Sequence, residues 1–151
     1  MALIEALSVA RDDVLQEASA SLERGHLVHY EASGLEASGR RLNDLFDLVV
    51  ECLAERTLAP IAQYANNVAE ERFNAGFDIA EVQTAFNVLE EAIWRVVIPG
   101  LPTQELLDSA GLIGTVFGAG KDALARTWVA LATSQHVPSL DLTALFEGRA
   151  N

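Results

Sequence analysis

Residues 75–82 read AGFDIAEV, and this stretch joins a signal for the end of one helix to a signal for the start of the next. Gly76 can adopt the left-handed backbone conformation that terminates many helices. Asp78 can cap the following helix, and Glu81, three residues later, can complete a capping box with it. The stretch therefore predicts a tight corner between two helices.

The segments on either side of this corner carry apolar residues at helical spacing. Before the corner, Pro60 suits a first helical turn, and we expect a helix over residues 59–75. After the corner, apolar residues from Val82 to Val96 recur every three or four positions, until residues 98–100, Ile-Pro-Gly, end the helix. Each helix therefore has one face suited to burial.

Helical spacing extends over most of the chain, and no segment alternates convincingly with the period of two expected of a half-buried strand. A chain of 151 residues with 50% hydrophobic residues can build one substantial core. The sequence predicts an all-α fold, a single globular helical bundle of five main helices over residues 1–151, with a connector at about 23–39. The expected helices cover residues 2–22, 38–56, 59–75, 78–97 and 103–134, followed by a short C-terminal helix at 140–147.

Acidic residues dominate the charge of the chain. Ten Lys and Arg against 22 Asp and Glu give a net charge of −12 and a pI near 4.5. This charge repels nucleic-acid phosphates and anionic lipid surfaces, so we expect neither as a partner. No run approaches the roughly 18 apolar residues of a membrane span, and the first residues do not resemble a signal peptide. We expect a cytoplasmic protein.

The single cysteine, Cys52, excludes an internal disulfide and fits a reducing compartment. It lies seven residues after Leu45 and borders the apolar stripe of the helix expected at 38–56. No basic residue or helix N-terminus is nearby to stabilise a thiolate. We therefore expect a buried core position for Cys52 rather than a reactive thiol.

Residues 114–122, GTVFGAGKD, superficially resemble a phosphate-binding loop. Such a loop places four residues between its first glycine and the Gly-Lys pair, and a Ser or Thr hydroxyl follows to hold magnesium. Here five residues separate Gly114 from Gly120, and the residue after Lys121 is the anion Asp122. The stretch is therefore not expected to bind a nucleotide.

The glycines of this region still require an explanation, because each one costs a helix about 0.8–1 kcal/mol relative to alanine. Gly111, Gly114 and Gly118 fall on one helical face. Three interpretations are open: a close contact between two subunits, a close crossing inside one subunit, or a break or kink in the helix. The three glycines are candidate residues for a helix–helix or dimer contact.

Histidines in the connector are candidate ligands for a small molecule or haem. His26 and His29, with the adjacent Tyr30, could contribute to such a site together with Trp94. Glu23 and His26 match half of a di-iron carboxylate motif, but no second half appears at a matching place. We therefore predict no metal site and no resident cofactor.

A polar surface covers the helix at 78–97 opposite its apolar seam. Glu91 and Arg95 on this surface have the spacing of an i, i+4 ion pair. A single helix surface does not provide two carboxylates across a cleft, and the chain has no recognisable nucleophile motif. We interpret the surface as solvated or partner-facing and expect no enzyme. Its polar residues are Gln83, Asn87, Glu90, Glu91 and Arg95.

Residues 64–97 resemble the N-terminal sensor domain of the RsbT co-antagonist family, the RsbRD type. The resemblance consists of a helix that ends in Glu71-Arg72, the corner at Gly76 and a following helix that reaches Trp94. Residues 118–132 are also similar to actinobacterial members. The resemblance implies a globin-like domain that binds no haem in the better-known relatives, forms homodimers and passes a signal to an output module, either on a separate partner or on a longer chain.

The resemblance and the lack of catalytic motifs together lead to an expectation about function. We expect a non-enzymatic regulatory or sensor domain of bacterial signalling or stress response that acts through protein–protein contacts as a homodimer. The protein partner is not identified by the sequence. The alternative is a helical sensor that binds a small ligand or haem.

Overall fold

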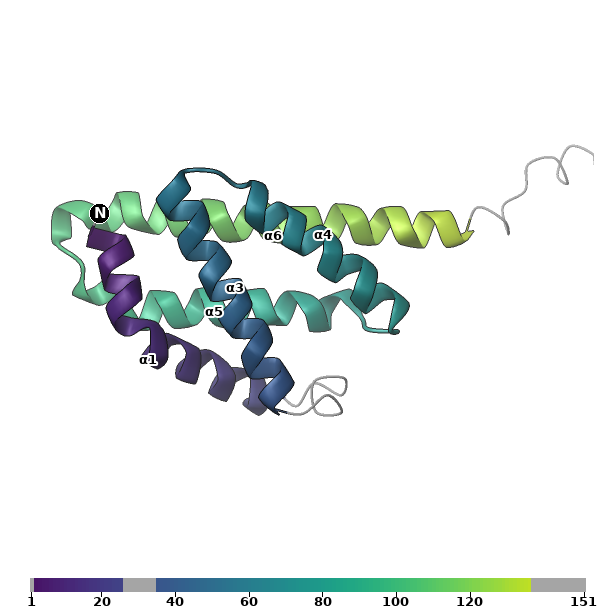
Figure 1. The fold of residues 1–151 in the computed structure, drawn as a ribbon, viewed down its shortest axis with the longest axis horizontal. Helices are drawn as coiled ribbons and strands as arrows, with labels where there is room; N and C mark the ends of the chain where they lie inside the picture. The colour runs from purple at the N-terminus through teal and green to yellow at the C-terminus, as the bar shows by residue number, and fades with distance from the viewer. Residues whose placement is uncertain (1, 26–34, 137–151) are drawn as a thin grey trace, which may run out of the picture.

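The computed structural model describes residues 2–25 and 35–136 of the chain. Within these ranges the structure consists of α-helices and short 3₁₀ turns with no β-strand, which confirms the all-α bundle (Figure 1). The helix expected at 140–147 lies outside the described residues. The elements are α1 (Ala2–Arg24), α3 (Leu35–Glu55), α4 (Ala59–Asn74), α5 (Ile79–Val96), η1 (Ile98–Gly100), η2 (Thr103–Glu105) and α6 (Leu106–His136).

Two helix boundaries differ from the sequence-based expectation. Helix α3 begins at Leu35, inside the expected connector, and continues through Gly39. One glycine costs a helix only about 1 kcal/mol, less than the packing of a long amphipathic helix can offset. Helix α6 is preceded by the 3₁₀ turn η2, so its regular part starts at Leu106 rather than near Thr103.

The corner between α4 and α5 has the predicted geometry. Gly76 has a φ of 84°, in the left-handed region that favours glycine. The N–H of Phe77 donates to the carbonyl of Arg72 at 3.0 Å, and the N–H of Gly76 donates to the carbonyl of Phe73 at 3.2 Å. These two bonds form a Schellman motif, which satisfies carbonyls at the end of α4 that the helix itself leaves without donors.

The capping box at the start of α5 is also present. The Asp78 side chain accepts a hydrogen bond from the N–H of Ala80 at 3.0 Å, and the N–H of Asp78 donates to Glu81 Oε1 at 3.3 Å. Both bonds use N–H groups at the helix start, which lack partners within the helix. One short stretch of sequence therefore both ends α4 and starts α5.

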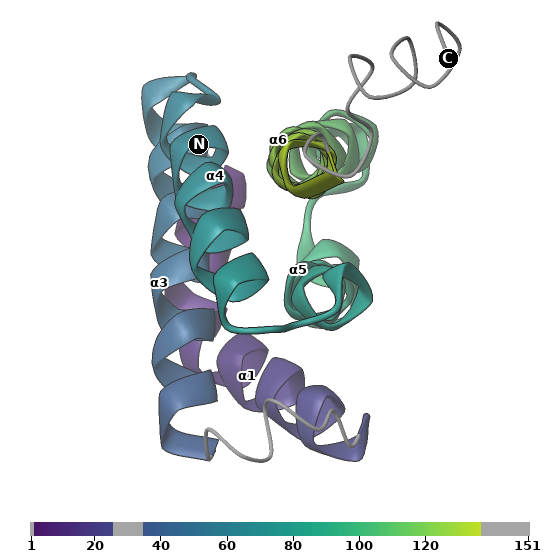
Figure 2. The same ribbon diagram turned by 90° about the vertical axis from the view of Figure 1, so that its right-hand side faces the viewer.

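The helices form two layers, which Figure 2 shows end on. Helices α3 and α4 lie side by side in one layer, α5 and α6 lie in the other, and α1 packs against both α3 and α5. Contacts between α4 and α6 join the layers. They include the edge-to-face pair of Phe73 and Trp128, with ring centroids 5.4 Å apart, and a hydrogen bond of 2.7 Å from the Thr127 hydroxyl to Asn66 Oδ1.

A single hydrophobic core fills the space between the layers. All five α-helices that the structure describes contribute to it, so each stabilises the others through buried apolar surface. Cys52 is buried in this core, which confirms the prediction made for it. The largest fully buried side chains of the core are Phe46, Phe86 and Phe117.

Gly120 lies where α6 meets α4 and α5. A Cβ atom at this position would lie 3.0 Å from Cε1 of Phe86 and 3.1 Å from Cγ1 of Ile61. Side chains in a packed core do not yield to such contacts without strain. The absence of a side chain at Gly120 therefore allows the close crossing of the three helices.

We predict that Gly120→Ala lowers the free energy of unfolding by about 1 kcal/mol, because the strain of overpacking exceeds the gain in helix propensity. Urea unfolding followed by circular dichroism measures the change. Gly39→Ala is the matched control: a Cβ there meets nothing within 4 Å among the described residues, so this variant is stabilised. Equal stability of the two variants would contradict the close-crossing interpretation.

For the corner, we predict that Asp78→Ala lowers the free energy of unfolding by about 1 kcal/mol, because the N–H groups at the start of α5 lose their acceptor. Asp78→Asn is the control, since asparagine caps a helix about as well as aspartate. Thermal unfolding of the two variants checks the prediction. An equal loss in both would show that the charge of Asp78, rather than its capping geometry, stabilises the corner.

Candidate functional site

The residues proposed as a small-molecule or haem site are only partly described by the structure. His26, His29 and Tyr30 lie outside the described residues. Trp94 lies on α5 with 41% of its surface exposed. That these four residues form one binding site therefore stays a prediction.

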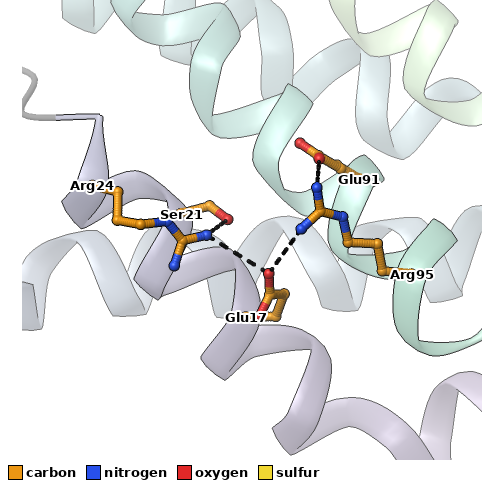
Figure 3. A network of polar contacts seen from close by, with 5 residues as sticks. All are labelled: Glu17, Ser21, Arg24, Glu91 and Arg95. Atoms are coloured by element: carbon orange, nitrogen blue, oxygen red, sulfur yellow. Dashed lines mark hydrogen bonds and ion pairs between the residues drawn. The ribbon is translucent and has the colours of Figure 1, made fainter.

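The polar surface of α5 makes contacts within the protein. The expected ion pair between Arg95 and Glu91 is present at 2.5 Å, and Arg95 also lies 3.5 Å from Glu17 of α1. Arg24 lies 3.7 Å from the same Glu17 carboxylate and donates a hydrogen bond to the Ser21 hydroxyl (Figure 3). Exposed pairs of this kind contribute little individually. Within this network the contact between Arg95 and Glu17 joins α5 to α1.

A second polar contact joins this surface to α6. Lys121 Nζ lies 2.9 Å from Glu90 Oε1 and 3.1 Å from Asn87 Oδ1. Residues 114–122 are α-helical throughout, so the stretch that resembles a phosphate-binding loop is not a loop. Lys121 therefore connects α5 with α6 instead of facing a phosphate.

The outer face of α6 has two glycines exposed to solvent, Gly111 and Gly118, and one half-buried glycine, Gly114. A Cβ atom at any of the three would meet nothing within 4 Å among the described residues. The crossing inside one subunit, considered for this face, is therefore wrong for the described part of the chain; the internal crossing uses Gly120 on another face. A break is also contradicted, because α6 is assigned as one helix over Leu106–His136.

Exposed apolar side chains extend the same face of α6 in both directions. Leu107 is 84% exposed and Val129 is 63% exposed. Leu107 lies four residues before Gly111 and Val129 lies eleven residues after Gly118, so both share the helix face of the glycines. The face formed by Leu107, Gly111, Gly114, Gly118 and Val129, called the α6 outer face below, therefore has glycines in its first half and exposed apolar side chains at both ends, with the charged Asp122 four residues after Gly118.

A cavity between α3 and α4 was not predicted from the sequence. It has a volume of about 410 Å³ and is lined by the side chains of three arginines, Arg40, Arg41 and Arg72. Two carboxylates, Asp44 and Glu71, also line it. The cavity therefore combines several charged groups at a junction of two helices, and we call it the arginine cavity.

Arg72 is the most deeply placed of these arginines, with 6% of its surface exposed. Its guanidinium carbon lies 5.4 Å from the centre of the Phe77 ring, and Nη1 forms an ion pair with Glu71. A cation over an aromatic face is stabilised by the ring quadrupole. The Schellman motif that places Phe77 after the end of α4 therefore also fixes the arginine side chain.

One sequence signal could have pointed to Arg72, though not to the other residues of this cavity. The buried residues of α4 are Ile61, Ala65, Ala69 and Arg72, which recur at intervals of four, four and three. Arg72 thus occupies a position on the buried stripe where an apolar residue is expected, and a buried charge requires partners. Arg40 and Arg41 offer no comparable signal, because their position beside α4 depends on the packing of α3.

Across the described part of the chain, no three His, Cys, Asp or Glu side chains are grouped as a metal site would need. None of the helices in residues 2–25 and 35–136 is long and apolar enough to cross a bilayer.

Comparison with protein-family models, curated proteins and solved structures gives no match to this chain. The similarity to RsbT co-antagonist sensor domains therefore stays a prediction from residues 64–97 and 118–132. The α6 outer face and the arginine cavity are therefore the two features of the described structure that bear on function.

The thiol of Cys52 provides a chemical test of the core. Burial raises its pKa, an effect larger than the lowering by a hydrogen bond with the backbone of Ile61. In the unfolded chain the thiol ionises at its ordinary pKa of about 8.5. The folded state keeps the neutral thiol at that pH, so the stability that Cys52 contributes is present below this value and is lost as the pH rises through the raised pKa.

We predict that iodoacetamide labels Cys52 at least about tenfold more slowly in the folded protein than in urea at pH 8.5, because burial suppresses the thiolate and blocks access. Mass spectrometry of quenched samples measures the labelling rate. The unfolded chain is the control, since Cys52 is the only cysteine. Labelling at similar rates in both states would contradict the buried position.

Proposed function

We propose that this chain is a non-enzymatic regulatory module of bacterial signalling or stress response, with a cytoplasmic location and a globin-like bundle. In this proposal it acts through protein–protein contacts and forms a homodimer through the α6 outer face. The observation that carries the proposal is the exposure of this face. Leu107 and Val129 are largely solvent-exposed, and Cβ atoms at the glycines between them would meet nothing within 4 Å in the described part of the chain.

The chemistry of the α6 outer face supports self-association. Glycines allow two helix backbones to approach closely, and a twofold axis brings the same face of each subunit together. The net charge of −12 opposes association of two copies in general. On α6, however, Asp122 pairs with Arg126 at 2.6 Å, which reduces the charge that two such helices would bring together.

The sensor alternative is favoured by a separate observation, the arginine cavity. A volume of about 410 Å³ is in the range of small-molecule sites. The haem form of the alternative depends instead on His26, His29, Tyr30 and Trp94. Addition of haemin tests that form, because axial ligation produces a Soret band that is absent from a non-binding protein.

Light scattering after size exclusion tests the dimer. We predict a dimer at micromolar concentration and at least about a tenfold weaker association for Gly118→Leu, because the added side chains separate the two backbones. The monomer accommodates leucine at Gly118, since a Cβ there meets nothing within 4 Å among the described residues.

Gly39→Leu is the matched control for this experiment. Gly39 is also helical, and a Cβ there meets nothing within 4 Å in the part of the chain that the structure describes, but it lies on α3 rather than on α6. We expect this variant to dimerise like the wild type. A monomeric wild-type protein, or dimerisation unchanged by Gly118→Leu, would refute the proposed interface.

A further inference from the structure

The arginine cavity concentrates positive charge on an acidic protein. Three of the ten basic residues of the chain line it, whereas Asp44 and Glu71 contribute two carboxylates. Among the described residues that line the cavity, positive charges therefore exceed negative ones by one, within a molecule whose total charge is −12. Such a local reversal of charge favours an anion inside the cavity over an anion at the surrounding surface.

The guanidinium of Arg72 is held in place before any ligand arrives. Its contact with the Phe77 ring and its ion pair with Glu71 restrict the side chain, and its burial reduces screening by water. A guanidinium has five N–H donors in a planar arrangement, so one carboxylate at Nη1 does not exhaust its capacity. Planar donors of this kind match the oxygens of a carboxylate or a phosphate.

The remaining residues that line the cavity are Asn43 of α3 and Tyr64 and Val68 of α4. The Val68 side chain and the Tyr64 ring provide apolar surface beside the arginines. A hollow of about 20 Å³ next to it, also lined by Arg72, is bounded by Val82 and Phe86 and can hold about one water-sized group. A ligand must therefore lie mainly in the larger space, with its charged end at the arginines and its apolar part against Tyr64 and Val68.

From these observations we infer that the arginine cavity binds a small amphipathic molecule with one oxyanion, a carboxylate or a phosphate, attached to an apolar body. A polyanion such as a nucleic acid is disfavoured, because most of the protein surface would repel it. The inference does not depend on dimerisation, since the cavity lies between α3 and α4 and the proposed interface lies on α6.

Isothermal titration calorimetry with three probes of one shape tests the inference. Phenylacetate carries a carboxylate, phenyl phosphate carries a phosphate, and phenylacetamide is the neutral control. We expect at least one of the anions to bind with a dissociation constant below about 10 mM and the amide to bind at least about tenfold more weakly. The anion with the lower dissociation constant shows whether the site prefers a carboxylate or a phosphate.

Arg40→Gln tests the position of the site, because Arg40 is exposed and its replacement leaves the core intact. We expect it to weaken binding of the preferred anion about tenfold through loss of a charge-assisted hydrogen bond. Arg126→Gln removes the same charge from α6, away from the cavity, and should change binding by less than about twofold. Circular dichroism verifies that both variants are folded.

Three results would overturn the inference: no binding of either anion at about 10 mM, equal binding of the neutral amide, or equal effects of Arg40→Gln and Arg126→Gln. The same titration with Gly118→Leu separates the two proposals. Anion binding that persists in a monomeric Gly118→Leu variant supports the cavity independently of the interface. Loss of anion binding in that variant would refute the claim that the cavity functions within one subunit.

Discussion

The stacking of Arg72 on Phe77 joins three features that would otherwise be independent. Phe77 is placed by the bonds that end α4, and its ring in turn holds the Arg72 guanidinium. The same guanidinium lines the arginine cavity. A change in the backbone at Gly76 would therefore alter the direction of α5 and the shape of the cavity together. The arrangement of the bundle and its main polar site depend on one short stretch of chain.

Packing around Gly120 determines which parts of α6 remain available for other contacts. The close crossing there fixes the inner face of α6 against Ile61 and Phe86. Lys121, the next residue, connects α6 to Glu90 and Asn87. Ile61 and Phe86 cover the side of α6 that carries Gly120, whereas no other described residue covers the Cβ positions of the glycines on the α6 outer face. The orientation of α6 therefore directs one face of the helix into the core and leaves the opposite face for the proposed interface.

Local features of the fold could be predicted from the sequence, whereas features that depend on distant helices could not. The corner at Gly76 and Asp78 was predictable because its bonds join residues a few positions apart. The spacing of Gly111, Gly114 and Gly118 did not identify the glycine at the internal crossing, which is Gly120, because only the packing of α4 and α5 decides which glycine is covered. The arginine cavity was missed for the same reason, since it combines Arg40 of α3 with Arg72 of α4.

Gly120 also limits how α6 can move. Shifting the register of a helix by one residue against its neighbours displaces it by about 1.5 Å and turns it by about 100°. At this crossing such a step would replace Gly120 by a residue with a Cβ atom, which would lie 3.0 Å from Phe86 and 3.1 Å from Ile61. The crossing at Gly120 therefore opposes a shift in the register of α6 against α4 and α5.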